Sequence, residues 1–240
     1  MKINYNHMKT LLFALAILLA SMPSRAQQEE INSEIEIQTR QLTPFENLRV
    51  MRGINVTLVE GKTPKAEIHI QNASADEVVI VQNNKDLDIR MRGLIYKDVA
   101  VNVYLYYQNI NEIAVGSGAS IFSDDVLETD YLKLESSSDA SIELEIDANV
   151  LEASVSASRI ELIGKAKYIS VSANTGGRFL AANLKSEECS IKNNTGSSAQ
   201  IWVTEKLNAR AGSGASIEYT GAPSKVEIHT SLGGKVESFE

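Results

Sequence analysis

The 240-residue chain has few of the residues on which most catalytic and metal sites depend, since it contains one cysteine and three histidines. The lone Cys189 cannot form an internal disulfide, and its alternation with Ile191 predicts a buried thiol rather than a nucleophile. His69 and His229 lie far apart in the sequence, with no clustered partners at the spacing of metal ligands. We therefore expect no catalytic residues, no metal and no cofactor.

Long hydrophobic runs are missing after the first residues. Lys2 and Lys9 precede an apolar run at residues 11–20, and the small residue Ala26 follows. This pattern is typical of a secretory signal peptide over residues 1–26, whose apolar run is too short to span a bilayer. We expect an exported chain, in the periplasm, on the cell surface or secreted, with no transmembrane segment after cleavage. An uncleaved anchor is the alternative, and it would leave the small-residue cleavage pattern unused.

Positive charge is also scarce. Cleavage after residue 26 removes three bases and no acid, which leaves 20 basic and 31 acidic residues and a net charge of −11. An acidic surface repels phosphate backbones and anionic lipid headgroups. The charge therefore excludes nucleic acid as a partner, and we expect a glycan or a cell-envelope protein instead.

What the sequence does contain is β-strand alternation. Residues 27–40 are polar and predict a flexible lead-in. Residues 41–112 predict a β-strand region that reads as a meander, with two apolar runs flanking a turn at 82–86. Residues 101–106 alternate apolar side chains with Asn102, Tyr104 and Tyr106, so one face of this strand is apolar and the other has aromatic hydroxyls.

From residue 113 to residue 240 the chain repeats with a period of about 19 residues. Each period is marked by an anchoring residue, preceded two positions earlier by a small residue and one position earlier by a polar one. The segment Gly116-Ser-Gly-Ala-Ser-Ile121 recurs unchanged at residues 212–217. The anchors are Ile121, Ile142, Ile160, Phe179, Ile201, Ile217 and Val236.

Two short strands and two bends fill each period and leave no room for a helix. Such a unit cannot bury its apolar stripe alone, whereas stacked coils bury the stripes in a continuous interior. The sequence thus predicts an all-β fold, a parallel β-helix or β-solenoid with an N-terminal β-rich meander region. A β-sandwich is the alternative, but it does not explain one small-residue position that is kept through seven periods.

The chain resembles the head GIN domain family, described as putative auto-transporter adhesins of Bacteroidetes-type bacteria. The resemblance rests on Phe45-Glu-Asn-Leu-Arg-Val50, on Gly53-Ile-Asn-Val56, on the Gly-Ser-Gly repeats and on the closing segment 217–223. It covers residues 41–238 and implies a right-handed parallel β-helix, an extracytoplasmic location and an adhesive role without catalytic residues. The central coils depart from the pattern, because 137–139 and 155–157 replace Gly-Ser-Gly.

Five outward positions are the candidate binding residues. Tyr104 and Tyr106 present flat amphipathic rings that suit sugars or proteins, and the alternative is packing against the N-terminal strands. Trp202 follows an anchor and is expected to point outward. Arg159 and Arg178 occupy the same position in adjacent coils, and a solvated pair of cations is the alternative to a site.

Three classes of function stay open on the sequence alone. The first is an exported, non-enzymatic binding module of the cell envelope. The second is a β-helix enzyme acting on polysaccharide, in the manner of a lyase, and the third is a purely structural envelope protein. The segment 236–240 keeps a strand pattern without a polar cap, so we also expect that the terminal coil forms a homo-oligomer or is covered by the meander.

Overall fold

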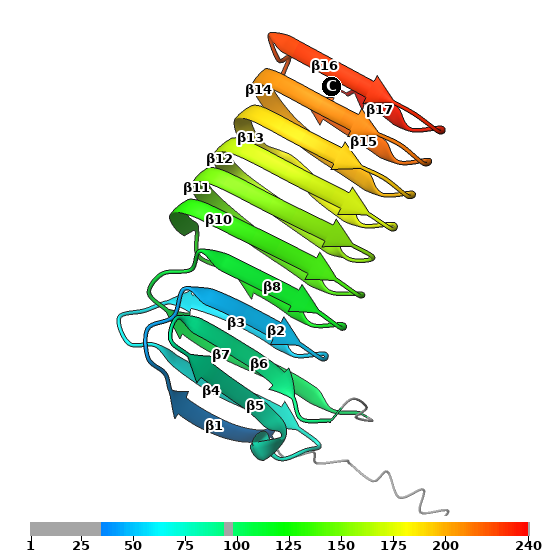
Figure 1. The fold of residues 1–240 in the computed structure, drawn as a ribbon. Helices are drawn as coiled ribbons and strands as arrows, with labels where there is room; N and C mark the ends of the chain where they lie inside the picture. Colours follow the sequence, from blue (N-terminus) through cyan, green and yellow to red (C-terminus); the bar gives the residue numbers. More distant parts are fainter. Residues whose placement is uncertain (1–34, 94–97, 240) are drawn as a thin grey trace, which may run out of the picture. The chain divides into compact units, whose positions relative to one another are not determined.

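The protein folds into short β-strands stacked coil upon coil in a computed structural model, which describes residues 35–93 and 98–239 (Figure 1). The predicted signal peptide, residues 1–26, lies outside the described residues, as do residues 27–34 of the predicted lead-in. The first nine strands are β1 (Ile35–Gln41), β2 (Asn47–Met51), β3 (Asn55–Glu60), β4 (Lys65–Gln71), β5 (Val78–Asn83), β6 (Asp86–Met91), β7 (Ala100–Tyr107), β8 (Glu112–Gly116) and β9 (Ser120–Ser123), with a 3-10 turn η1 (Ala75–Glu77). The other eight are β10 (Leu127–Ser137), β11 (Ser141–Ser156), β12 (Arg159–Asn174), β13 (Arg178–Asn193), β14 (Ser198–Ala211), β15 (Ser216–Thr220), β16 (Lys225–Thr230) and β17 (Lys235–Ser238).

Strands β10 to β14 pair in parallel, each with the next in the chain, which confirms the predicted β-solenoid. Each long strand bends, so that one half lies in a first sheet with β2, β6, β8 and β16 and the other half in a second sheet with β3, β7, β9, β15 and β17. Equivalent apolar residues stack in columns that face the interior. One such column consists of Leu132, Leu151, Ile169, Cys189, Leu207 and Val226.

The two sheets meet at a corner where two successive residues have left-handed backbone. Ser117 and Gly118 have φ values of 54° and 72°, a conformation that glycine adopts without Cβ strain. The amide of Gly118 donates to the carbonyl oxygen of Ser138 in the next coil at 2.9 Å. The same bond recurs down the stack from Gly176 to Thr195, from Gly196 to Ser213 and from Gly214 to Leu232. The Gly-Ser-Gly segment is therefore a corner that links neighbouring coils through the backbone.

The predicted position of one anchor is wrong. Ala199, not Ile201, lies between Phe179 and Ile217 in neighbouring coils. Ile201 lies opposite Ala181, two residues further along β13, so the spacing of large apolar residues misleads there. The sequence pattern places Ala199 at the small corner position, because its side chain is only a methyl group.

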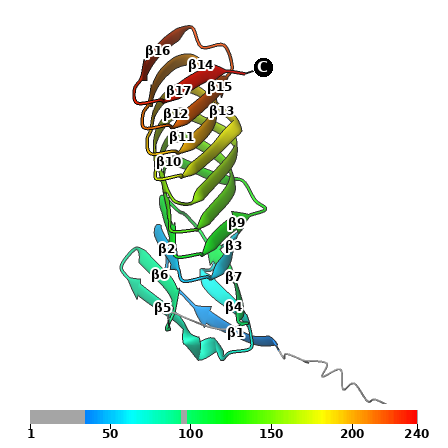
Figure 2. The ribbon, with the colours of Figure 1, turned by 90° about the vertical axis from the view of Figure 1, so that its right-hand side faces the viewer.

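The order of the coils differs from the order of the chain at the N-terminal end. Strand β2 lies between β6 and β8 (Figure 1), and β3 lies between β7 and β9 (Figure 2), all in parallel. The coil formed by β2 and β3 is thus inserted between two coils that follow it in the sequence. In the predicted meander region 41–112, antiparallel pairing of successive strands is confirmed for β5 and β6, whereas β2, β3 and β7 extend the solenoid.

Antiparallel strands close this end of the solenoid. Strand β5 pairs with β6, β4 pairs with β7, and β1 pairs with β4. The guanidinium group of Arg40 in β1 donates to the carbonyl oxygens of Val78, at 2.6 Å, and of Ala75, at 2.8 Å. Residues 35–40 of the predicted lead-in thus belong to a polar strand that pairs with the free edge of β4, a pairing that no local pattern reveals.

Candidate binding surfaces

Aromatic rings gather on the outer surface of the second sheet, near the N-terminal end. Tyr104 of β7 lies between Glu67 of β4 and Thr57 of β3, and its side chain is 38% exposed. Phe122 of β9 lies on the other side of Thr57 and is 40% exposed. Tyr106, two residues along β7, is half-buried. We call Tyr104, Tyr106 and Phe122 the aromatic face.

Charged groups of β4 border the aromatic face and fix its rings. The ammonium group of Lys65 lies 4.1 Å from the ring centroid of Tyr106, and the ring of His69 makes an edge contact with Tyr104 at 5.1 Å between centroids. The carboxylate of Glu67 bonds to His69 Nε2 at 2.9 Å and lies 3.7 Å from Lys65 Nζ. The hydrogen bond from His69, followed by the charge of Lys65, lowers the pKa of the Glu67 carboxyl group.

The structure brings together two of the predicted binding residues and separates the others from them. Tyr104 and Tyr106 share the outer surface of β7, as the alternation predicts, whereas Tyr107 is buried. Trp202 belongs to β14, which is separated from β7 by several strands of the same sheet. Its indole ring lies 5.1 Å from the ammonium group of Lys185 and covers Gly221, where an added Cβ would clash with it.

Arg159 and Arg178 lie directly opposite each other in β12 and β13, as the repeat predicts. Arg159 forms an ion pair with Glu161, two residues along its own strand. Both arginines are exposed. The acid on its own strand neutralises Arg159, whereas Arg178 forms no ion pair with a described residue.

Sequence reasoning missed Phe122, Lys65 and Glu67 as parts of the aromatic face. Each lies on an outward position of its strand, so alternation gives its direction, but only the pairing of β4 with β7 and of β3 with β9 places it beside Tyr104. In the part of the chain that the structure describes, no group of three or more His, Cys, Asp or Glu side chains is placed to hold a metal ion. Nor does any helix among these residues have the length and apolar character needed to cross a membrane.

Comparison with known proteins identifies the family. A family model described as a putative auto-transporter adhesin, head GIN domain, matches residues 44–223. The chain belongs to this family. A search of curated proteins gives no match to this head GIN chain.

Solved structures share the head GIN fold at low sequence identity. A putative adhesin from Bacteroides fragilis matches with a TM-score of 0.79 and 14% identity, over 86% of this chain and 97% of that one. A putative adhesin from Parabacteroides merdae matches with a TM-score of 0.72 and 19% identity, over 87% and 98%. A putative lipid binding protein from Parabacteroides distasonis matches with a TM-score of 0.68 and 15% identity, over 87% and 98%.

The head GIN residues of this chain hold the inserted coil in place. Asn55, the last residue of Gly53-Ile-Asn, accepts a bond from Ser120 Oγ at 2.7 Å on one side and donates to Asn102 Oδ1 at 3.2 Å on the other. Its neighbour Ile54 is fully buried. The segment that gives the resemblance is thus used for architecture rather than for chemistry.

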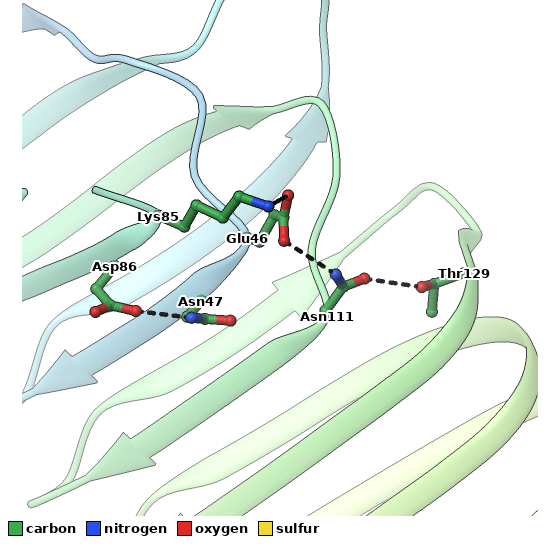
Figure 3. Close-up of polar contacts among 6 residues, drawn as sticks. All are labelled: Glu46, Asn47, Lys85, Asp86, Asn111 and Thr129. Atoms are coloured by element: carbon green, nitrogen blue, oxygen red, sulfur yellow. Dashed lines mark hydrogen bonds and ion pairs between the residues drawn. The ribbon is translucent and has the colours of Figure 1, made fainter. Parts of the chain in front are cut away.

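A second set of polar contacts joins the inserted coil to its neighbours at the start of β2 (Figure 3). Glu46 forms an ion pair with Lys85 of the coil below at 2.5 Å. Its other carboxylate oxygen accepts from Asn111 Nδ2 at 3.4 Å, and Asn111 Oδ1 accepts from Thr129 at 3.2 Å. Four coils are linked in this way along the edge of the first sheet.

Proposed function

We propose that this head GIN domain is an exported, non-enzymatic, adhesin-like module of the cell envelope, and that its aromatic face binds the sugar rings of a glycan. The observation on which the proposal rests is the set of exposed rings held at fixed positions on a stacked sheet. Its family and two of its solved neighbours are described as adhesins, not enzymes, which supports a binding role.

The chemistry of the aromatic face fits a sugar. The flat rings of Tyr104 and Phe122 offer apolar surfaces to the C–H faces of a pyranose, while the phenol hydroxyl and the Glu67 carboxylate bond to its hydroxyls. Because Lys65 and His69 already contact the rings of Tyr106 and Tyr104, these two side chains lose less entropy on binding. The flat surface fits a chain of sugars lying along the sheet.

A glycan array followed by calorimetry on a bound glycan tests the proposal. The variant Tyr104→Ala should bind about tenfold or more weakly, because a central aromatic contact contributes roughly 2 kcal/mol. Tyr131→Ala is the matched control, since Tyr131 is 40% exposed but belongs to β10. Equal binding by Tyr104→Ala and wild type, or equal loss in the control, would contradict the proposal.

Two further arms of the same experiment separate the alternative functions. One solved neighbour is named a putative lipid binding protein, so neutral phosphatidylcholine vesicles are included as a probe. Binding to vesicles that is lost in Tyr104→Ala, without any glycan binding, would replace the glycan by a lipid. Shortening of a bound polysaccharide would instead favour the lyase-like enzyme, and the absence of every ligand would favour the purely structural role.

For the predicted homo-oligomer we propose a second copy of this chain, bound at the terminal coil of β16 and β17. Val226, Ile228 and Leu232 are 40%, 42% and 82% exposed, and no strand of the described residues pairs with the outer edge of this coil. Both strands contain Lys-Val-Glu, at 225–227 and 235–237. Antiparallel pairing centred on either valine brings each lysine opposite a glutamate of the second copy, and this charge complementarity favours self-association.

A further inference from the structure

Two basic side chains for which the described residues supply no ion pair lie opposite each other on the first sheet. Lys192 of β13 lies directly opposite Arg210 of β14, and Arg210 lies opposite His229 of β16. Both Lys192 and Arg210 are exposed, and neither forms an ion pair with any described residue. Like charges opposite each other in a sheet repel, so this arrangement costs stability while it is unoccupied.

Several other cations of the molecule have acidic partners. Lys133 lies 3.0 Å from a carboxylate oxygen of Glu112 and 2.8 Å from one of Glu135, and Lys165 lies 2.8 Å from Asp147. The chain has 31 acids for 23 bases, so acids are plentiful. Lys192 and Arg210 differ from these cations in that they lie directly opposite each other and neither has an ion pair with a described residue, so both are available to an anion from outside.

The two bases line one end of a shallow hollow that is floored by serines. Its volume is about 350 Å³, at the lower end of the range of small-ligand sites, roughly 300–1,000 Å³. The floor consists of the outward side chains of three neighbouring strands, Ser154, Ser170, Ser172 and Ser190. At the opposite end lie Lys133, Glu135 and Glu152. We call this set the serine hollow.

We propose that the serine hollow binds an acidic sugar, with its carboxylate or sulfate group on Lys192 and Arg210 and its hydroxyls on the serines and on Glu152. A forked guanidinium and an adjacent ammonium suit a carboxylate or sulfate, and serine hydroxyls both donate to and accept from sugar hydroxyls. A phosphorylated peptide would bind the same two cations, but it would leave the four serine hydroxyls without the hydroxyl partners that a sugar supplies. The inference goes beyond the proposed function, because the serine hollow and the aromatic face belong to different sheets.

Calorimetry with a tri-glucuronate and with the matching neutral tri-glucoside tests this site. The acidic sugar should bind, the neutral sugar should bind about tenfold more weakly, and Lys192→Gln/Arg210→Gln should reduce the acidic affinity by about tenfold or more. Lys165→Gln is the control, because Lys165 is exposed and already paired with Asp147. Tyr104→Ala should leave this affinity unchanged, which separates the site from the aromatic face.

A thermal melt of the unliganded double variant adds a readout that a structural role would not give. If the two cations are retained for a ligand, their removal relieves repulsion and the melting temperature of Lys192→Gln/Arg210→Gln rises or stays constant. A marked fall would show that the pair is structural and would overturn the proposal. Equal binding of both sugars, equal loss in Lys165→Gln, or equally tight binding of inorganic sulfate alone would also overturn it.

Discussion

The two ends of the solenoid differ in how far they cover the apolar interior. Leu87 in β6, near the N-terminal end, and Ile228 in β16, in the terminal coil, belong to one inward column that runs through the whole stack. Leu87 is 1% exposed and Ile228 is 42% exposed. The same position is thus part of the core at one end and part of the surface at the other.

The two ends differ in exposure because antiparallel strands pair at the N-terminal end, whereas the terminal coil is parallel to the coil before it. At the N-terminal end, β4 and β5 run antiparallel to the coil strands, β1 pairs antiparallel with β4, and the Val78 and Ala75 side chains complete the core there. A parallel coil leaves the edge of its last strand unpaired, whereas an antiparallel flap can end on a polar strand. The N-terminal end is therefore covered by antiparallel strands that do not follow the repeat. The terminal coil of β16 and β17 still follows the repeat.

The two ends should differ most in the free energy of unfolding that is lost when a side chain of the inward column is truncated. Leu87→Ala should lower the free energy of unfolding by about 2–5 kcal/mol, because it removes a buried side chain and leaves a cavity. Ile228→Ala should lower it by less than about 1 kcal/mol, because much of that side chain is already in water. Urea denaturation followed by circular dichroism measures both. Similar losses would show that the terminal coil is covered in solution.

The N-terminal closure itself should depend on Arg40. Arg40→Ala removes bonds to two backbone carbonyl oxygens, so we expect a loss of roughly 1.5–3 kcal/mol in the free energy of unfolding. Arg49→Ala is the control, since Arg49 is exposed on β2, and we expect a change within about 0.5 kcal/mol. A loss in Arg40→Ala no larger than in the control would mean that β1 contributes little to closing this end.

The thiol of Cys189 measures burial in the middle of the stack, away from both ends. Burial raises the pKa of its thiol to about 12. Above pH 9 the unfolded thiol ionises while the folded one keeps its proton, so stability falls as pH rises toward 12, by at most about 1.4 kcal/mol per pH unit. Burial likewise raises the pKa of Tyr107 to about 12, so part of the slope remains in Cys189→Ala. Urea titrations at pH 8 and pH 10.5 compare the two proteins, and equal slopes would contradict a buried thiol.

Ile228→Asp should have the smallest effect on the free energy of unfolding, but it should clearly weaken self-association. A carboxylate at the exposed end of the inward column should abolish pairing of terminal coils and leave the fold intact. Sedimentation velocity should show a dimer for the wild type and a monomer for this variant. Ile37→Asp, at an exposed isoleucine of β1, is the control and should stay dimeric. A monomeric wild type would exclude the proposed self-association.

Much of the fold could be predicted from local patterns. The repeat of about 19 residues locates the corners, and alternation assigns Tyr104, Arg159 and Arg178 to the outer surface. Ala199 was missed as an anchor because a methyl group fits a corner and a narrow core equally well. For the candidate surfaces, alternation gives the direction of Phe122 and Lys192, but which residues become neighbours depends on which strands pair.

The sequence by itself determined the solenoid. Each stacked coil is stabilised by its nearest neighbours, so every period needs the same pattern of residues. Only the tertiary structure decided the insertion of β2 and β3 between later coils, the closure by β1 and the neighbours of Tyr104. Those features rest on pairings between residues 24 to 65 positions apart, such as Gln41 with Lys65 and Asn55 with Asn102 and with Ser120. Contacts over that distance leave no periodic signal, so they are visible only once the chain is folded.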